Sequence, residues 1–277
     1  MALAQVINTE SVAAVLKSLS FPVAKEDAFT KDGQRIPGKV IVRTDTRKPL
    51  SWVGDTYGLI PHSTMLEPVL KEFADQFVIK RTVIEREGRR VEVDLLSKEQ
   101  FSVIKGDAVR LKISMLNSLD RTQSFKYLAG AFRLKCSNGM GVFLEGASVR
   151  LTEAHTKLVE QRVNAGRLQE GISLLLKKFS EATANFKRLA DTKVTDEQAQ
   201  KLVESVVGKK SVEEVLKLWT EGRGQNGDKT AWALYNGVSQ LLTDKEQVAL
   251  LPVSASVRTF SKTTAMLRGL NLLASKN

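Results

Sequence analysis

The sequence predicts an α+β fold, with an antiparallel β-sheet core and a packed helix followed by a mainly helical C-terminal half. Short apolar segments separated by turn residues recur as far as about residue 136, and several of them alternate apolar and polar side chains. From about Glu153 the apolar residues return at helical spacing instead. We therefore divide the 277 residues into an α+β basic core domain, 1–150, and a helical region, 151–277, with a basic C-terminal tail.

The N-terminal part is predicted to begin with a short helix and to continue as a meander. Residues 10–20 carry apolar side chains at helical spacing, and Phe21-Pro22 ends that pattern. The stretch 24–38 is polar and contains Gly and Pro, so we expect a loop. Short strands are then expected at 40–42, 50–53 and 57–60.

The rest of the core domain is predicted as a helix and further antiparallel strands. A helix is expected over 62–76 and a hairpin over 77–96, with its turn at Arg86-Glu87-Gly88. Apolar Val91 and Val93 alternate with Glu92 and Asp94, which predicts one buried and one solvated face. A strand follows at 109–115, and 124–136 forms a weaker strand or helix.

The second half is predicted as a series of helices. A long apolar pattern at helical spacing covers 158–189. The residues Thr195-Asp196-Glu197-Gln198 form a capping box that begins a helix ending near Gly208. Two more helices are expected at 211–221 and 229–242, and the tail 252–277 is expected to be a basic helix or arm without acidic residues.

The composition restricts the chemistry. With 42 Lys and Arg against 31 Asp and Glu, the formal charge is +11, which favours a polyanionic partner. A single cysteine, Cys136, excludes an intramolecular disulfide and a multi-cysteine metal site, and two histidines, His62 and His155, exclude a His-rich centre. We find neither a signal peptide nor the roughly 18 apolar residues of a membrane span, and expect a cytoplasmic protein with no membrane partner.

Catalytic motifs are incomplete. Residues 33–39 have the spacing of a phosphate loop, but Val40 stands where Ser or Thr is required, so a polar loop is the better interpretation. Cys136 is interpreted as a structural thiol. Asp residues beside turns are better explained by turn formation than by Mg²⁺ binding, which leaves a nuclease as an open alternative: Asp45, Asp55, Asp107 and Asp120. No catalytic residue, metal or cofactor is expected.

Basic residues concentrate in the predicted β core. Residues 31–135 hold 20 basic and 13 acidic side chains, and the acid-free tail adds more basic ones. Cations interspersed with aromatic rings suit single-stranded nucleic acid, because its phosphates need charge and its exposed bases stack. The predicted nucleic-acid-binding residues are Arg43, Arg47, Lys48, Trp52, Tyr57, Arg110, Lys112, Asn117, Arg121, Lys126, Arg133, Lys135, Arg258, Lys262 and Arg268.

Four segments together resemble a known family. These are VIVRTDTRKPLSWVGDTYGLIPHS, SMLNSLDRT, FRLKCSNGM and TAWALYNGVSQL, which lie between about residues 40 and 245. The chain is similar to an uncharacterised family encoded by phages, plasmids and prophages, the domain of unknown function nine-three-two. The resemblance brings no established catalytic residues. It implies a mobile element in a bacterial host, and the expected architecture is similar to that of phage single-strand annealing proteins, which form rings or filaments.

These observations predict a non-enzymatic, single-stranded DNA-binding protein of a mobile element, and a candidate for strand annealing. A homo-oligomer in the form of a ring or filament belongs to this hypothesis, because a repeating protomer holds a strand extended with its bases exposed. Two alternatives remain open at this point. One is an anti-defence or regulatory factor that binds an acidic protein, and the other is the metal-dependent nuclease.

Overall fold

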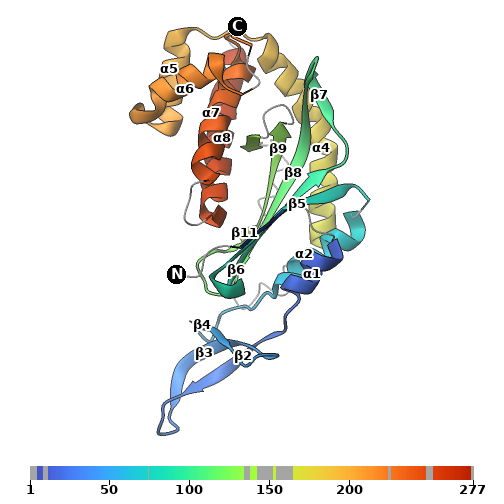
Figure 1. Ribbon diagram of the computed structural model, residues 1–277, viewed down its shortest axis with the longest axis vertical. Coiled ribbons are helices and arrows are strands. Elements are labelled where there is room, and N and C mark those ends of the chain that lie inside the picture. Colours follow the sequence, from blue (N-terminus) through green and yellow to red (C-terminus); the bar gives the residue numbers. More distant parts are fainter. Residues whose placement is uncertain are drawn as a thin grey trace. The chain divides into compact units, whose positions relative to one another are not determined.

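A computed structural model confirms the α+β class, with antiparallel sheets in the N-terminal half and mostly helices in the C-terminal half (Figure 1). The structure describes residues 5–8, 12–73, 75–133, 138–141, 152–153, 165–223, 226–247 and 252–275. The chain forms two compact units from discontinuous segments. Unit 1 contains residues 1–95, 114–127 and 149–172, and unit 2 contains 96–113, 128–148 and 173–277. The predicted boundary near residue 150 falls outside the described residues.

The strands form two antiparallel sheets. A small sheet has the order β2-β3-β4, and a large sheet has the order β1-β5-β6-β8-β9-β10, with β7 paired to β8 and β11 paired to β9. The strands are β1 (Gln5–Asn8), β2 (Val23–Phe29), β3 (Arg35–Arg43), β4 (Pro49–Val53), β5 (Phe77–Glu85), β6 (Arg90–Ser97), β7 (Phe101–Ile104), β8 (Asp107–Ser118), β9 (Phe125–Arg133), β10 (Asn138–Gly141) and β11 (Thr152–Glu153).

The helices follow the predicted order. The first two belong to unit 1, and most of the remainder belong to unit 2. They are α1 (Val12–Leu19), α2 (His62–Phe73), α4 (Ala165–Asp191), α5 (Asp196–Val207), α6 (Val212–Glu221), α7 (Ala231–Gln247) and α8 (Pro252–Ala274). Within the described part of the chain, no helix has the length and apolar character needed to cross a membrane.

The small sheet corrects the prediction of a loop over 24–38, because nearly all of β2 and the beginning of β3 lie there. The pairing jumps from Asp27 opposite Lys39 to Ala28 opposite Ile36, so Pro37 and Gly38 lie in a bulge. Proline donates no ladder hydrogen bond, and a bulge is one of the few places where a strand tolerates it. The Pro-Gly pair therefore marks an irregularity inside a strand.

The predicted strand at 57–60 is also wrong. These residues form no named strand, and Tyr57 N donates to Gly54 O in a turn. Their apolar side chains serve the core instead, because Tyr57 and Leu59 pack with Ile41, Val53 and Leu119. A short apolar run therefore reflects burial here and forms no named strand, although Tyr57 is a single β-bridge residue.

The β5–β6 hairpin is confirmed, but its polar face is not solvated. Glu92 is 0% exposed and Asp94 is 2% exposed. Arg81 pairs with both carboxylates, through Nη2 to Glu92 Oε1 at 3.1 Å and through Nε to Asp94 Oδ2 at 3.0 Å. Ser114 Oγ also donates to Asp94. Ion pairing and hydrogen bonding thus compensate the burial of charges that the alternating pattern had assigned to water.

The core of unit 2 surrounds α7. Residues 231–243 of this helix are all buried, including polar Asn236 and Ser239. Trp232 packs against Phe186 and Tyr235 at ring-centroid distances of 5.1 and 6.0 Å. The predicted capping box of α5 is confirmed, with Thr195 Oγ1 accepting from Gln198 N and Thr195 N donating to Gln198 Oε1.

Candidate nucleic-acid interface

Three turns of unit 1 hold an arginine in the left-handed backbone region. Arg47 has a φ of 56°, Arg86 of 50° and Arg121 of 64°. Within the described part of the chain, Glu87 is the one further non-glycine residue with a positive φ. Such conformations cost energy for residues with a Cβ, and they concentrate where a fold positions functional groups.

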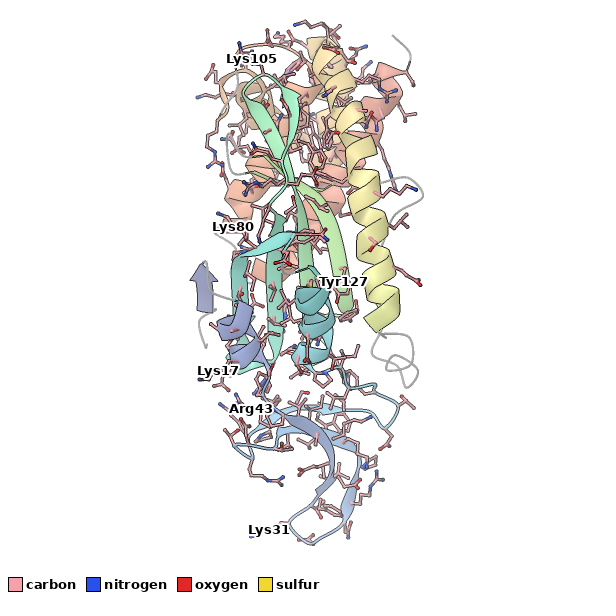
Figure 2. All side chains as sticks on the ribbon, turned by 90° about the vertical axis from the view of Figure 1, so that its right-hand side faces the viewer. Lys17, Lys31, Arg43, Lys80, Lys105 and Tyr127 are labelled. Atoms are coloured by element: carbon pink, nitrogen blue, oxygen red, sulfur yellow. The ribbon has the colours of Figure 1, made fainter. Side chains whose placement is uncertain are left out.

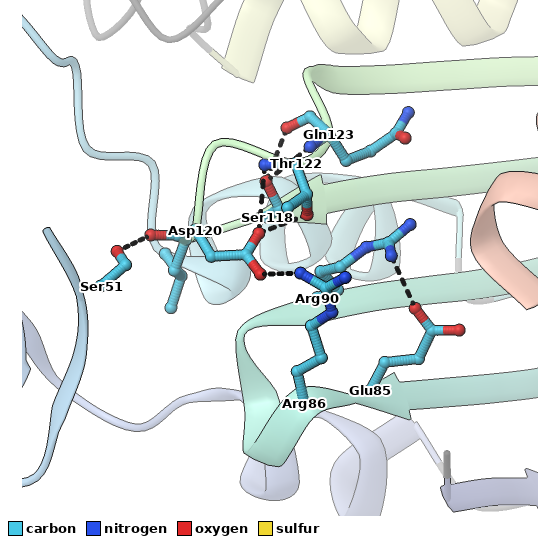
Figure 3. A network of polar contacts seen from close by, with 9 residues as sticks. Ser51, Glu85, Arg86, Arg90, Ser118, Asp120, Thr122 and Gln123 are labelled. Atoms are coloured by element: carbon cyan, nitrogen blue, oxygen red, sulfur yellow. Dashed lines mark hydrogen bonds and ion pairs between the residues drawn. The ribbon is translucent and has the colours of Figure 1, made fainter. Parts of the chain in front are cut away.

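The three turns contact one another. Lys48 Nζ lies 2.6 Å from Glu87 Oε2, which joins the turn after β3 to the turn after β5. Arg86 Nη1 lies 3.0 Å from Asp120 Oδ2, and Leu119 N donates to Arg89 O at 2.6 Å. We call residues 44–48, 86–89 and 119–122 the three-turn cluster; Figure 3 shows the Arg86–Asp120 pair that joins two of these turns.

Side-chain hydrogen bonds hold the turn between β8 and β9 in place. Ser118 Oγ donates to Gln123 O at 2.7 Å and accepts from Gln123 N at 3.0 Å. Asp120 Oδ1 accepts from Thr122 N, and Ser51 Oγ of β4 donates to Leu119 O (Figure 3). The turn that carries Arg121 is therefore fixed to both sheets of unit 1.

Arg121 is the most available cation of the cluster. Its side chain is exposed, and it forms no ion pair with the residues that the structure describes. Lys48 and Arg86 are about half exposed, with 49% and 41% of their side-chain surfaces accessible, while each pairs with one carboxylate. The linked turns thus bring together Arg121, which has no ion pair among the described residues, and the partly neutralised Lys48 and Arg86.

The carboxylates of Glu87 and Asp45 stay ionised at neutral pH. Lys48 lowers the pKa of Glu87 through a hydrogen bond and its charge, and Arg43 lowers the pKa of Asp45 in the same way. Basic side chains still outnumber acidic ones in and around the cluster. The basic ones are Arg43, Arg47, Lys48, Arg86, Arg89 and Arg121, and the acidic ones are Glu26, Asp45, Glu87 and Asp120.

Two residues predicted to contact nucleic acid are buried. Tyr57 is 6% exposed, and its hydroxyl donates to Ser118 O at 3.2 Å. Burial and the charge of Asp120 raise its pKa, against the opposing charge of Arg121. Asn117 is 0% exposed and donates to Ile60 O at 2.8 Å. Tyr57 and Asn117 therefore stabilise the turns from the protein interior and are not accessible to a ligand.

The other predicted residues are distributed over several elements. Trp52, on β4 beside the cluster, is 53% exposed. Arg110 and Lys112 are half-buried on the part of β8 that belongs to unit 2, and Lys126 is half-buried on β9. On α8, Arg258 and Arg268 are exposed and Lys262 is half-buried. Arg133 belongs to β9, while its side chain, Lys135 and Cys136 lie outside the described residues.

Arg86 and Arg89 were missed as binding candidates. Their sequence looks like an ordinary hairpin turn, and only the tertiary pairing of the two turns brings them beside Lys48 and Arg121. No local pattern identifies them, although a turn with two consecutive charged residues in place of Asn-Gly is unusual for a tight hairpin.

The turn aspartates have separate partners. Asp45 pairs with Arg43, Asp55 with Arg35 and Asp120 with Arg86. Asp107 accepts from Trp232 Nε1 at 2.9 Å in the core of unit 2. Among the described residues, no group of three or more His, Cys, Asp or Glu could hold a metal ion. The geometry gives no support to the nuclease alternative.

Comparison with protein-family models places the chain in a family. The model described as domain of unknown function (DUF932) matches residues 49–268. The chain belongs to this family. A search of curated proteins and a search of solved structures found no match. The matched range includes two turns of the cluster, 86–89 and 119–122, together with α7 and most of α8, whereas the turn 44–48 precedes it.

The late motif of the resemblance has a structural role. Trp232 and Tyr235 of the W-x-L-Y-N segment lie in the aromatic core of unit 2, and Asn236 Nδ2 donates to Trp232 O. These residues are buried, with Trp232 2% and Asn236 1% exposed. The motif therefore belongs to the core of unit 2, and the exposed cations of the three-turn cluster lie elsewhere in the chain.

Proposed function

We propose that this chain is a single-stranded DNA-binding protein and that the three-turn cluster contacts the phosphates. The observation that carries the proposal is the convergence of Arg47, Arg86 and Arg121, all with left-handed backbones, at three linked turns. Arginine guanidinium groups present several donors to a phosphate, and turns extend them from a rigid sheet. The acid-free α8, with exposed Arg258 and Arg268, supplies a second basic surface within unit 2.

We further propose that the protein serves a mobile element, as the family resemblance implies, and that it anneals complementary strands. Annealing requires a strand held by its phosphates so that its bases stay available. Cations fixed at turns suit this task, because they contact the backbone without reading base edges. A repeating assembly would extend the held strand, so a homo-oligomer is part of the proposal, and no nucleotide or metal is consumed.

Binding of a labelled oligothymidine, followed by fluorescence anisotropy over a range of salt concentrations, tests this proposal. We expect salt-dependent binding without cleavage. Replacing Arg121 by Ala should reduce the slope of log K against log salt by about 0.7, the value for one phosphate contact on a single strand. Lys31→Ala is the matched control, because Lys31 is an exposed cation on the β2–β3 turn, outside the cluster (Figure 2).

Three outcomes would redirect the proposal. Absence of binding at about 50 mM salt would overturn it and favour an acidic protein as the partner. Cleavage that requires Mg²⁺ would favour the nuclease. Equal losses from Arg121→Ala and Lys31→Ala would show that net charge, and not the cluster, governs binding. The mass of the assembly with and without DNA tests the oligomer separately.

A further inference from the structure

The indole of Trp52 lies against a glycine of the neighbouring strand. Gly38 of β3 has a φ of 102°, which favours glycine. A Cβ at this position would lie 2.7 Å from Trp52 Cζ2, 2.8 Å from Trp52 Cε2 and 2.7 Å from Val53 O. The ring therefore occupies the space where any other residue would place its side chain. Trp52 is nevertheless 53% exposed, so the side chain that contacts Gly38 remains about half open to solvent.

Trp52 lies on the face of the small sheet that points away from the core. Ile41 and Val53 face the core and are fully buried. Glu26 pairs with Val40, and Val40 pairs with Trp52, so these three side chains share the opposite face. We call this the outer face. Apolar Ile36, 37% exposed, belongs to the same hairpin.

Arg47 links the outer face to the three-turn cluster. Its guanidinium binds the Glu26 carboxylate in a bidentate manner, at 2.6 and 2.9 Å. This pairing neutralises the carboxylate of Glu26. Glu26 lies on the outer face in β2, two strands away from Trp52 in β4. A ligand on the indole therefore meets an apolar surface without an unpaired carboxylate at Glu26, which is complementary to a base.

We propose that Trp52 is a stacking platform for an unpaired base of the strand whose phosphates contact the three-turn cluster, and that Gly38 positions the ring. This inference rests on the proposed function and deepens it, because it names the residue that would contact the bases of the bound strand. A paired base in a duplex has both of its faces covered by its neighbours, so it is not available to the indole. Stacking tolerates every base, and the platform reads no sequence.

The protein contains a built-in probe of the platform. It has three tryptophans, and Trp219 and Trp232 are 1% and 2% exposed. A base that stacks on the remaining tryptophan, Trp52, should quench its fluorescence and protect it from acrylamide. The two buried indoles provide a constant background, and Trp52→Ala shows what they contribute.

The test compares an oligothymidine with an abasic oligonucleotide of equal length, which keeps the phosphates and removes the bases. We expect wild type to bind the oligothymidine about fivefold to 100-fold more tightly than the abasic strand, a range that corresponds to one stacked base. Trp52→Ala should abolish this difference, and Trp52→Phe should retain part of it. The abasic strand should bind wild type and Trp52→Ala equally.

Gly38→Ala tests the positioning role, with Gly33→Ala as the matched control. Both glycines have a positive φ in the same hairpin region, but a Cβ at Gly33 meets nothing within 4 Å. We expect Gly38→Ala to reduce the quenching by oligothymidine while Gly33→Ala preserves it, with circular dichroism confirming that both variants fold. If Gly38→Ala does not fold, the Trp52 variants decide the question.

The outcomes distinguish the platform from the proposed function. If both strands bind wild type with equal affinity and Trp52 fluorescence does not change, the platform is wrong while phosphate binding stands. If neither strand binds, both proposals are overturned. If Trp52→Ala dissociates an assembly of the DNA-free protein and leaves the difference between the strands unchanged, the outer face is a protein interface and the platform is also overturned.

Discussion

Asn117 donates a hydrogen bond from Nδ2 to Nδ1 of His62, at 3.1 Å, between β8 and the first residue of α2. With Nδ1 as acceptor, the proton of His62 lies on Nε2, which donates to Gly88 O at 2.8 Å. His62 also packs edge-on against Phe21, with ring centroids 5.7 Å apart. One buried imidazole thus ties a hairpin turn of the three-turn cluster to the strand that leads into another of its turns.

Asn117→Ala should destabilise the fold without removing a contact to DNA. The change leaves His62 Nδ1 and Ile60 O without their buried donor, which costs about 1–3 kcal/mol. Urea denaturation followed by circular dichroism measures the loss. A double-mutant cycle with His62→Ala should give a non-zero coupling energy, since the residues are in contact. A stable Asn117→Ala variant with strongly weakened DNA affinity would restore Asn117 as a binding residue.

Gly88→Ala should cost more stability than Gly33→Ala. Both glycines have a positive φ, 89° and 80°, so alanine pays a backbone penalty of about 1–2 kcal/mol at either position. Only at Gly88 does a Cβ meet a side chain, because Phe21 Cε1 and Cζ lie 3.2 Å away. The difference between their urea midpoints, measured under one condition, isolates the contact with Phe21. Equal midpoints would show that Phe21 moves aside at no cost.

Asp107→Ala should loosen the core of unit 2. The buried Trp232 Nε1 then loses its carboxylate acceptor, at a cost of about 1–3 kcal/mol. Asp107→Asn retains an acceptor and should recover part of the stability. Near-ultraviolet circular dichroism of the aromatic cluster, together with thermal unfolding, reports both variants. If Asp107→Asn is as unstable as Asp107→Ala, the charge matters more than the hydrogen bond to Trp232.

Thr195→Ala should destabilise the start of α5 by about 1 kcal/mol, because the capping hydrogen bond to Gln198 N is lost. Thr195→Ser keeps the hydroxyl and serves as the control, with an expected change close to zero. Chemical denaturation measures both. A Thr195→Ala variant that matches wild type would mean that water replaces the cap completely.

The Lys48–Glu87 pair should contribute stability that depends on pH. Lys48 lowers the pKa of Glu87 below its ordinary value of 4.5. A lowered folded-state pKa means that the contribution is present above pH 4.5 and is lost as the pH falls through the lower folded value. Melting temperatures of wild type and Glu87→Gln should therefore differ at pH 7 and converge in acid. A difference that persists at low pH would assign the effect to packing.

The local sequence predicted the elements that rest on short-range physics. The capping box of α5 depends on two residues three positions apart, and its hydrogen bonds follow from that spacing. The hairpin of β5 and β6 and the alternation along β8 follow from period-two patterning. The basic residues Arg43, Arg47 and Lys48 near β3 and β4, and the aromatic Trp52 close to them along the chain, were also visible in the sequence.

Sequence patterns whose structural role depends on residues far away in the chain led to wrong predictions. Pro37 and Gly38 resemble a loop until β2 and β4 are placed beside them, because a bulge is defined only by its pairing strand. Glu92 and Asp94 resemble a solvated face until Arg81 pairs with them. The same holds for Tyr57. Its aromatic ring was predicted to stack on a base, but it is buried in the core of unit 1.

The sequence by itself determined the α+β class, the helical periodicity of the second half, the helix cap at Thr195 and the excess of positive charge, because propensity, spacing and charge are properties of neighbouring residues. Only the tertiary structure decided which of those charges meet. Arg47, Arg86 and Arg121 are far apart along the chain, and their turns come together through Lys48–Glu87, Arg86–Asp120 and the hydrogen bond from Leu119 N to Arg89 O. Strand pairing and burial set these contacts, and both depend on the whole fold of unit 1.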